Sequence, residues 1–326
     1  MRRRLGTDGP EVCALGLGCM SFAGAFGETT EAESFAALDR ARDMGIDFLD
    51  TANIYGPHRS EEVLGRWMAS RGVRPVIATK AGIQRDPDRP VNNDPAHLEA
   101  ELDGSLKRLG LDHVDLYYIH RHEASVPIEE VAEFMGTLIA KGKIGGWGMS
   151  EISPTTLRRA HAVTPVRAVQ NEYSLWTRQP ELGLVQDCAR LGVAFVAFSP
   201  LARGVLGTDP FDVTSLKEGD FRHPMPRFQP EHWPQNAANS QAFRDHARAK
   251  GTTAPALALA WLMAQGDHVI PIPASRTAAH VSDWADALTL DLGPEDLAEI
   301  DAILPVGWAW GDRYSDQQAR TPERYC

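Results

Sequence analysis

Residues 48–56 read FLDTANIYG, and in this stretch an apolar run ends in the carboxyl group of Asp50, with Tyr55 five residues further on. Two later runs end in the same way, with Lys80 closing PVIATK and His120 closing VDLYYIH. Short apolar runs of this kind are typical of the buried strands of a parallel sheet. If the strands are neighbours, their carboxyl ends bring the four polar side chains to one rim.

The rest of the chain repeats the same unit, a short strand followed by an amphipathic helix. Leu98, Leu102, Leu106 and Leu109, for example, share one face of a predicted helix. Strands that alternate with helices over about 300 residues favour an α/β fold, a (β/α)8 TIM barrel with long loops at its carboxyl face. The predicted strands are 15–19, 46–50, 75–80, 114–119, 143–149, 166–170, 193–198 and 268–272. The predicted helices are 30–44, 59–70, 94–109, 127–140, 154–162, 180–191, 237–249, 254–265, 277–287 and 294–303.

Three segments stand outside this alternation. Residues 2–14 carry a TDGP turn and predict an N-terminal β-hairpin. Residues 201–236 form a long connection rich in Gly and Pro, which indicates a loop that clamps a ligand, and 305–326 form a C-terminal tail. An open doubly wound sheet is the alternative fold, but no G-x-G-x-x-G follows an early strand. Because no linker or internal repeat is present, residues 1–326 are expected to form a single domain.

The composition excludes several classes of partner. A chain of 326 residues with 43% hydrophobic and 24% charged residues is typical of a globular protein. The net charge of −11 disfavours nucleic acid or an anionic membrane as a partner. Four scattered cysteines without a C-x-x-C pair indicate reduced thiols in a cytoplasmic enzyme. The basic start MRRR lacks a following signal-peptide core, and no apolar run approaches ~18 residues, so no membrane span is expected.

A phenol, an ammonium, a carboxylate and an imidazole at one rim form a proton-donating apparatus. Tyr55 alone, with an ordinary pKa of about 10, is a poor acid near neutral pH. The ammonium of Lys80 is expected to lower that pKa, and Asp50 would hold the lysine charged and in place. His120 would orient a carbonyl oxygen or share in the proton transfer, so that the group protonates this oxygen as negative charge develops. None of these side chains supplies hydride, so carbonyl reduction would need a nicotinamide cofactor.

Eight segments in chain order resemble the successive motifs of the aldo-keto reductases. They are LGLGCM, FLDTANIYG, ATKAG, DLYYIHR, GKIGGWGMSE, VQNEYSLW, FSPLARG and IPIPASR, and the match runs from about residue 2 to 304. DFRHPMPRFQ and ALAWLMAQG resemble a bacterial and fungal subgroup that reduces assorted aldehydes and ketones. The resemblance implies a (β/α)8 barrel that binds NADPH without a Rossmann domain, and an activity of the alcohol dehydrogenase (NADP+) type on a small carbonyl substrate. It also implies that Tyr55 is the general acid, assisted by Lys80, Asp50 and His120.

The same resemblance assigns residues to the nicotinamide and pyrophosphate of the cofactor. It places Ser150 and Gln170 against the carboxamide, with Glu151 or Asn171 nearby. Phe198 falls where the family stacks an aromatic ring on the nicotinamide, although a plain buried aromatic at a strand end is the alternative. Backbone N–H groups of the following loop would contact the pyrophosphate. That loop contains Ser199, Pro200, Leu201, Arg203 and Gly204.

At the adenosine end, the resemblance places Arg276 on the 2′-phosphate, because a guanidinium matches a phosphate by forked geometry. Here the chain also departs from the family. His280 stands where a basic residue is frequent, and Asp283-Trp284 replaces the usual Glu-Asn pair near the adenine. These changes weaken the expected preference for NADPH, so NADH stays an alternative cofactor. The residues expected at this end are Ser275, Arg276, Thr277, His280 and Asp283.

Aromatic residues near the strand ends predict an apolar substrate pocket. His122 occupies a position that holds Pro, Val or Ile in relatives, and either adds a polar contact or faces solvent. The tail carries Trp308, Trp310 and Tyr314. In the family this loop helps to select substrate; a disordered end with aromatic anchors is the alternative. The predicted substrate residues are Met20, Phe22, Phe26, Arg121, His122 and Trp176.

Two other functions fit parts of the pattern. A metal-dependent hydrolase barrel would use His120 and His122, which share one face of a strand. However, the later strands end in Ser150, Gln170 and Ser199, which supply no ligand set, so no metal site is expected. A catalytically slow NADPH-binding regulatory protein of the same fold is the other alternative, and the retained quartet argues against it. The physiological carbonyl, the direction of reaction and the oligomeric state stay open.

Overall fold

Eight parallel strands form the centre of the protein, for which a computed structural model describes residues 1–324. Each strand pairs with the next in chain order. The ring closes between the first and last of them, where the N–H groups of Gly16 and Gly18 donate to the carbonyls of Pro271 (3.0 Å) and Pro273 (2.9 Å). The predicted (β/α)8 barrel is therefore confirmed. Its strands are β3 (Leu17–Gly18), β4 (Phe48–Asp50), β5 (Val76–Ala81), β6 (Leu116–Ile119), β7 (Trp147–Ser150), β8 (Ala168–Glu172), β9 (Ala194–Phe198) and β10 (Val269–Ile272).

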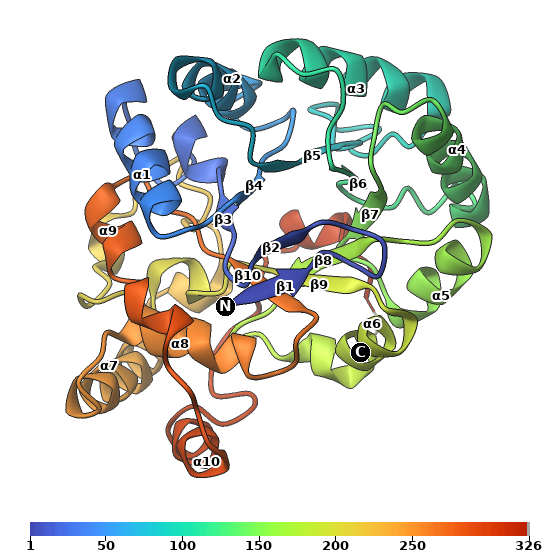
Figure 1. Ribbon diagram of the computed structural model, residues 1–326. Helices are drawn as coiled ribbons and strands as arrows, with labels where there is room; N and C mark the ends of the chain where they lie inside the picture. The colour runs from blue at the N-terminus through green and yellow to red at the C-terminus, as the bar shows by residue number, and fades with distance from the viewer. Residues whose placement is uncertain (325–326) are drawn as a thin grey trace.

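Helices alternate with these strands and form the outer ring of the barrel (Figure 1). Within residues 1–324, no helix combines the length and apolar character needed to cross a membrane. The α-helices are α1 (Glu31–Asp43), α2 (Arg59–Arg71), α3 (Pro95–Leu109), α4 (Ile128–Ala140), α5 (Pro154–Val163), α6 (Leu184–Leu191), α7 (Trp233–Ala249), α8 (Ala254–Met263), α9 (Ala278–Ser282) and α10 (Pro294–Ile303). Short 3-10 helices are η1 (Met20–Ala23), η2 (Gln179–Leu182), η3 (Ala202–Gly204), η4 (Val213–Ser215), η5 (Pro226–Phe228), η6 (Ala285–Leu288) and η7 (Gln318–Arg320).

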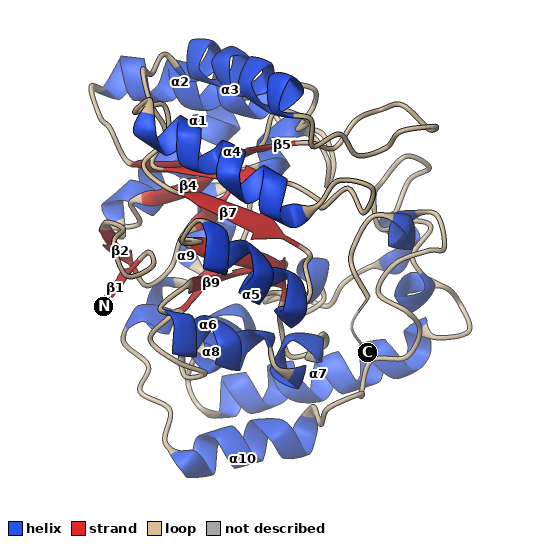
Figure 2. Ribbon diagram, turned by 90° about the vertical axis from the view of Figure 1, so that its right-hand side faces the viewer, coloured by secondary structure: helices blue, strands red, loops and turns tan. Residues whose placement is uncertain are grey.

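The predicted hairpin is also confirmed and closes the amino-terminal end of the barrel. Strands β1 (Arg2–Arg4) and β2 (Glu11–Cys13) pair antiparallel. Leu5 and Val12 of this segment are fully buried and belong to the same apolar cluster as the barrel interior. Figure 2 shows the hairpin and the long loops at opposite ends of the barrel. Access to the interior is therefore from the carboxyl ends of the strands.

The barrel interior is filled by alternate residues of each strand. Phe48, Ala78, Tyr118 and Val196 belong to this cluster. Gly148 completes the packing, since a Cβ there would lie 2.5 Å from a carbon of the Tyr118 ring. Side chains of a strand alternate between its two faces, so the residue two positions after each of these points the same way. Those next residues are Asp50, Lys80, His120, Ser150 and Phe198, all predicted site residues.

Three predicted helices differ from the structure. The helix predicted at 180–191 is divided into η2 and α6, because Gly183 has a φ of 126° that no helix accommodates. The helix predicted at 277–287 is divided into α9 and η6. Helix α7 begins at Trp233 rather than residue 237, with Pro234 in its first turn, where a missing N–H costs nothing. The long connection is thus shorter than predicted and contains η3, η4 and η5.

The cysteines of the described chain are buried free thiols, namely Cys13, Cys19 and Cys188. Burial raises the pKa of Cys19 and of Cys188, so both are thiols at neutral pH. The fourth cysteine, Cys326, lies outside the described residues.

Candidate active site

The quartet predicted from the sequence converges at the carboxyl end of the barrel. Lys80 is fully buried, and its Nζ forms an ion pair with Asp50 and donates to the carbonyl of Thr51 at 2.8 Å. The Nζ lies 5.3 Å from the centroid of the Tyr55 ring. The side-chain amide of Gln170 donates to the second oxygen of Asp50 at 2.7 Å. The carboxylate is thus satisfied on both oxygens, and the lysine is fixed beneath the tyrosine.

Burial has a larger effect on the pKa of Tyr55 than the neighbouring Lys80 has. Burial raises the pKa of the phenol, and the Lys80 ammonium lowers it only in part, so the net shift is upward. The expectation of a net downward shift in the pKa of Tyr55 is therefore wrong. For Lys80, burial lowers the pKa, but the charges of Asp50 and Tyr55 outweigh it and raise the pKa above its ordinary value. At neutral pH the site holds a protonated phenol beside a charged ammonium.

His120 is neutral at the same pH. Burial, reinforced by the positive charges of Arg121 and Lys80, holds its pKa well below the ordinary value. Its ring meets that of Tyr55 edge to face, with centroids 5.8 Å apart. The imidazole Nδ1 is buried and makes no hydrogen bond within residues 1–324. A neutral imidazole beside the phenol can orient a carbonyl oxygen without competing for its proton.

A cavity of about 840 Å³ opens above the quartet and runs along the carboxyl face. Asp50, Tyr55 and His120 line it, whereas Lys80 lies behind them. Met20, Phe26 and Arg121 of the predicted substrate residues also line it. Most predicted cofactor residues contribute to the wall, whereas Glu151, Asn171 and Thr277 do not line it. Those in the wall are Ser150, Gln170, Phe198, Ser199, Pro200, Leu201, Arg203, Gly204, Ser275, Arg276, His280 and Asp283.

Three predicted substrate residues lie outside this wall. Phe22 is fully buried in the apolar core beneath η1. His122 is held by the tail, because its Nδ1 contacts Glu323 at 2.6 Å and its Nε2 contacts the carbonyl of Val126 at 3.0 Å. Trp176 is buried against Arg227, whose guanidinium lies 4.8 Å from a Trp176 ring centroid. The prediction that these three residues line the pocket is therefore wrong. Each side chain packs against other parts of the protein, and the local sequence does not reveal those contacts.

The far end of the cavity presents the Arg276 guanidinium and the Ser275 hydroxyl, whereas the Thr277 hydroxyl caps the N-terminus of α9. Ser275 and Thr277 form a local turn in which the Ser275 hydroxyl accepts from the Thr277 N–H at 3.0 Å. Arg276 donates to the carbonyl of Glu28 at 2.8 Å and makes no ion pair within the described chain. Asp283 accepts from the hydroxyl of Thr208 at 2.8 Å, which ties the long loop to α9. The unpaired guanidinium at one end, and the amide of Gln170 with the ring of Phe198 at the other, fit the phosphate and the nicotinamide of an extended dinucleotide.

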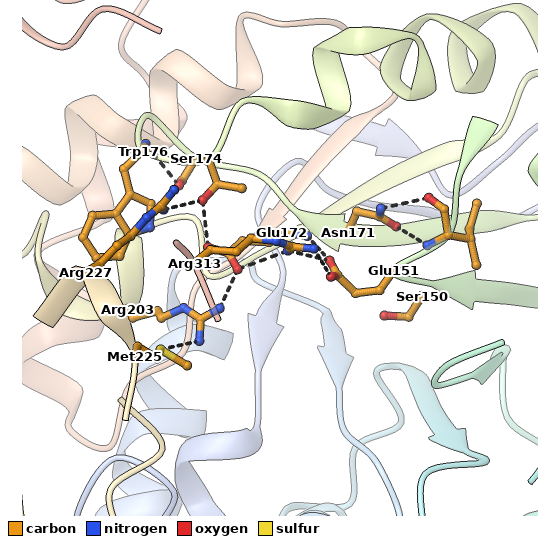
Figure 3. Close-up of polar contacts among 12 residues, drawn as sticks. Ser150, Glu151, Asn171, Glu172, Ser174, Trp176, Arg203, Met225, Arg227 and Arg313 are labelled. Carbon is orange, nitrogen blue, oxygen red and sulfur yellow. Dashed lines mark hydrogen bonds and ion pairs between the residues drawn. The ribbon is translucent and has the colours of Figure 1, made fainter. Parts of the chain in front are cut away.

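A buried charge cluster, made of Glu151, Glu172, Arg203, Arg227 and Arg313, was not anticipated as a unit (Figure 3). Arg313 of the tail pairs with Glu151 and lies 3.4 Å from Glu172. Arg203 pairs with Glu172 at 2.5 Å. Arg227 donates to Thr177 at 2.8 Å, and the Thr177 hydroxyl donates to Glu172 at 2.9 Å. Glu172 therefore joins the long loop and the tail to the barrel.

The cluster sets the charge states of its members. Burial alone raises the pKa of Glu172, but Arg203 and Arg313 lower it to about 2. Burial lowers the pKa of Arg227 to about 10. Glu172 lies two residues beyond Gln170 on the inward face of β8. This spacing is the one feature of the sequence that indicates a position for Glu172 near the site. The partners come from a loop and a tail without periodicity, so their meeting was not predictable.

The backbone is strained where the cavity wall leaves the strands. Glu151 and Ser199, directly after β7 and β9, have φ values of 56° and 49°. Ala202 and Arg203 in the long loop have φ values of 52° and 58°. A non-glycine residue in this left-handed region of φ costs about 1–3 kcal/mol, and the conformation persists where surrounding contacts hold it. The buried charge cluster supplies those contacts for Glu151 and Arg203.

The tail makes contacts with the carboxyl face of the barrel as far as Glu323. The indole of Trp308 donates to the carbonyl of Leu175 at 2.7 Å, and Tyr314 lines the cavity. Glu323 accepts from the N–H of Ser153 at 2.7 Å and from the hydroxyl of Thr156. The tail thus contributes to the cavity wall and is not a disordered end.

No group of three or more His, Cys, Asp or Glu side chains suited to a metal occurs in residues 1–324. Both ring nitrogens of His122 are occupied by other partners. The pair His120 and His122 therefore does not present two ligands to one site.

Comparison with known proteins agrees with this geometry. The sequence model of the Aldo/keto reductase family matches residues 14–305. "Aldo-keto reductase yakc [NADP(+)]" of Schizosaccharomyces pombe is 38% identical over 320 residues, which cover 96% of this chain and 94% of that protein. Among solved structures, the glycerol dehydrogenase AKR11B4 from Gluconobacter oxydans superposes with a TM-score of 0.85 at 26% identity, covering 97% of this chain and 98% of that one.

A second structure, the aldo-keto reductase AKR11C1 from Bacillus halodurans in its holo form, has a TM-score of 0.78 at 24% identity. It covers 94% of this chain and 97% of its own, and it supports the fold alone. The match of the family model over nearly the whole barrel, together with 38% identity to a relative that is covered over 94% of its length, shows that this chain belongs to the aldo/keto reductase family.

Proposed function

We propose that the protein is an NADPH-dependent reductase of the alcohol dehydrogenase (NADP+) type, which converts an aldehyde or ketone to the alcohol. The observation that carries the proposal is a protonated Tyr55 at the base of a cavity, backed by a buried Lys80–Asp50 pair. The family membership and the NADP(+) in the name of the yeast relative support the same activity.

NADPH, when bound, supplies a hydride to the carbonyl carbon. Arg276 would hold the 2′-phosphate, and Ser275 with Thr277 would add hydroxyl groups at the same end. Ser150 and Gln170 would hold the carboxamide near the quartet, and Phe198 would cover the ring. The loop from Ser199 to Gly204 would contact the pyrophosphate, as its place in the cavity wall allows.

The protein's own part is proton transfer to the carbonyl oxygen. Tyr55 donates its proton as negative charge develops on that oxygen. Lys80 stabilises the phenolate that results, and Asp50 keeps the ammonium in place. His120, neutral and adjacent, donates a hydrogen bond that fixes the carbonyl oxygen near the phenol. One hydride and one proton are thereby added across the carbonyl bond.

A panel of neutral aldehydes and ketones tests this function. The purified protein is mixed with NADPH and each carbonyl, and the loss of reduced cofactor absorbance is followed together with the alcohol formed. Turnover on at least one carbonyl is expected. NADPH binding without turnover on any of them would indicate the slow regulatory protein instead.

The pH profile of the reaction is expected to be asymmetric. Reduction needs the protonated phenol, and the pKa of Tyr55 is raised, so kcat/KM should stay level through neutral pH and fall only in the alkaline range. His120 is already neutral at pH 7, so its titration adds no decline there. Oxidation of the alcohol needs the phenolate and should rise with pH. Profiles measured in both directions check this, and a decline of reduction near neutral pH would contradict it.

Arg276→Ala is expected to weaken NADPH binding by roughly 10- to 100-fold, the loss of a charge-assisted contact. NADH lacks the 2′-phosphate, so its affinity should change less than about threefold. Fluorescence titration with both cofactors measures the difference. Equal weakening for NADPH and NADH would remove the assignment of Arg276 to the 2′-phosphate.

A further inference from the structure

Four arginines line the cavity, and they differ in what neutralises them. Arg203 pairs with Glu172, and Arg222 pairs with Asp220 at 2.8 Å. The other two, Arg121 and Arg276, form no ion pair with any carboxylate in residues 1–324. An incompletely solvated guanidinium without a counter-ion is costly, so an unpaired arginine in a cavity wall marks a place for an anion.

The two unpaired arginines belong to different parts of the cavity. Arg276 lies at the end assigned above to the 2′-phosphate. Arg121 directly follows His120 and is close enough to Tyr55 to lower the pKa of its phenol. Its charge also acts on His120 and on Tyr314 of the tail. Lys80, behind the wall, is paired with Asp50, so Arg121 is the cation at the reacting end that lines the cavity without a paired carboxylate in residues 1–324.

The contacts of Arg121 leave donors unused. One terminal nitrogen donates to the carbonyl of His120 at 2.6 Å and lies 3.3 Å from the Ser150 hydroxyl, and both partners are neutral. The Nε is buried and has no hydrogen-bond partner in the described chain. The neighbouring loops contribute Ile54 and Ile83 to the wall, which offer no charge. A substrate entering here meets apolar surface and a single unpaired guanidinium.

From this arrangement we infer that the preferred substrates are oxo compounds that carry an oxyanion, a carboxylate or a phosphate ester, a few bonds from the carbonyl. Arg121 binds the oxyanion while Tyr55 protonates the carbonyl oxygen, and the carbonyl carbon receives the hydride from NADPH. The product is the corresponding hydroxy acid or hydroxy phosphate, with the anionic group unchanged. The inference rests on the proposed reductase function and adds the substrate class.

The test compares each anionic carbonyl with a neutral partner of similar size. The pairs are succinic semialdehyde with its methyl ester, and glyceraldehyde phosphate with glyceraldehyde. Wild-type protein, Arg121→Gln and the surface variant Arg66→Gln are assayed with NADPH. Arg121→Gln should lower kcat/KM for the preferred anion by roughly 10- to 100-fold, mainly through KM, and for the neutral partner less than about threefold. Arg66→Gln should leave kcat/KM unchanged for the anionic and for the neutral substrate, because Arg66 lies in an exposed ion pair with Glu31.

The outcomes separate the two levels of the proposal. No turnover on any carbonyl would overturn the reductase function itself. Turnover with equal kcat/KM for anionic and neutral partners would overturn the substrate class alone. A fall of kcat for both partners in Arg121→Gln would show that Arg121 supports the chemistry and not the anion. Selectivity for one pair only would identify the oxyanion as carboxylate or as phosphate.

An inhibition experiment on the wild-type protein tests the same inference without requiring that the Arg121→Gln variant folds. Butyrate and methyl butyrate, which lack the reacting carbonyl, are added during reduction of a neutral aldehyde, in parallel with inorganic phosphate. Competitive inhibition by at least one anion, with none by the ester, is expected. Equal inhibition by acid and ester, or none by either anion, would overturn the inference.

Discussion

Replacement of Tyr55 by Phe should lower kcat for aldehyde reduction by about 10²- to 10⁴-fold, the usual contribution of a positioned general acid. The ring and its packing against His120 are retained, and only the hydroxyl is removed. NADPH affinity should change little, because the residues proposed to hold the cofactor lie on other strands. Steady-state kinetics with a cofactor titration measure both quantities.

Tyr118→Phe is the matched control for this variant. The Tyr118 ring lies 5.8 Å from the Lys80 Nζ, a distance close to that of Tyr55, but Tyr118 is buried inside the barrel. Its hydroxyl makes no hydrogen bond of ordinary length within residues 1–324, and Gln170 is the side chain near enough to act on its pKa. Removing this hydroxyl should leave kcat near the wild-type value. Wild-type activity in Tyr55→Phe, or equal losses in both variants, would remove Tyr55 from its assigned role.

Replacement of Glu172 by Gln should lower the free energy of unfolding by about 3–5 kcal/mol, the cost of removing one partner from a buried ion pair. Glutamine keeps the size of the side chain but removes the carboxylate that pairs with Arg203 and lies 3.4 Å from Arg313. Denaturant unfolding of the two proteins measures the loss. Glu129→Gln, which removes an exposed pair with Arg159, should leave the unfolding midpoint nearly unchanged.

The stabilisation by Glu172 should also depend on pH in a defined direction. Its pKa is about 2 in the folded protein and near the ordinary 4.5 in the unfolded chain. The depressed pKa means that the stabilisation is complete above the unfolded value and is lost as pH falls toward 2. The difference between wild type and Glu172→Gln should therefore be constant at neutral pH and shrink in acid. A constant difference down to the acid limit would contradict the role of the charged carboxylate.

The barrel and the catalytic end were predictable because both follow local rules. Asp50, Lys80 and His120 each end an apolar strand, and strands in chain order place such ends side by side. Side chains alternate between the two faces of a strand, so Ser150 and Phe198 lie on the inward face, two residues after positions inside the barrel. Strand order alone brings Asp50, Lys80 and His120 together, whereas Ser150 and Phe198 were expected at the site from the resemblance to the aldo-keto reductases.

The errors come from contacts between distant segments. His122 was a substrate candidate by its place after β6, but Glu323, 201 residues away, holds its ring. Trp176 was a candidate by its place after β8, but Arg227 and the tail enclose it. The direction of the pKa shift of Tyr55 does not follow from the sequence, because the sequence shows the neighbouring charge and not the degree of burial. Loops and tails lack the periodicity that would reveal such partners.

The most direct test of the central claim is a single-turnover experiment on the protein loaded with NADPH. Wild type and Tyr55→Phe are mixed with an aldehyde that the wild type reduces, and oxidation of the bound cofactor is followed by stopped-flow absorbance. The wild type should oxidise one equivalent of NADPH per site with formation of one equivalent of alcohol, and Tyr55→Phe should do so at least about 100-fold more slowly. Oxidation at the same rate in both proteins would show that Tyr55 is not the proton donor.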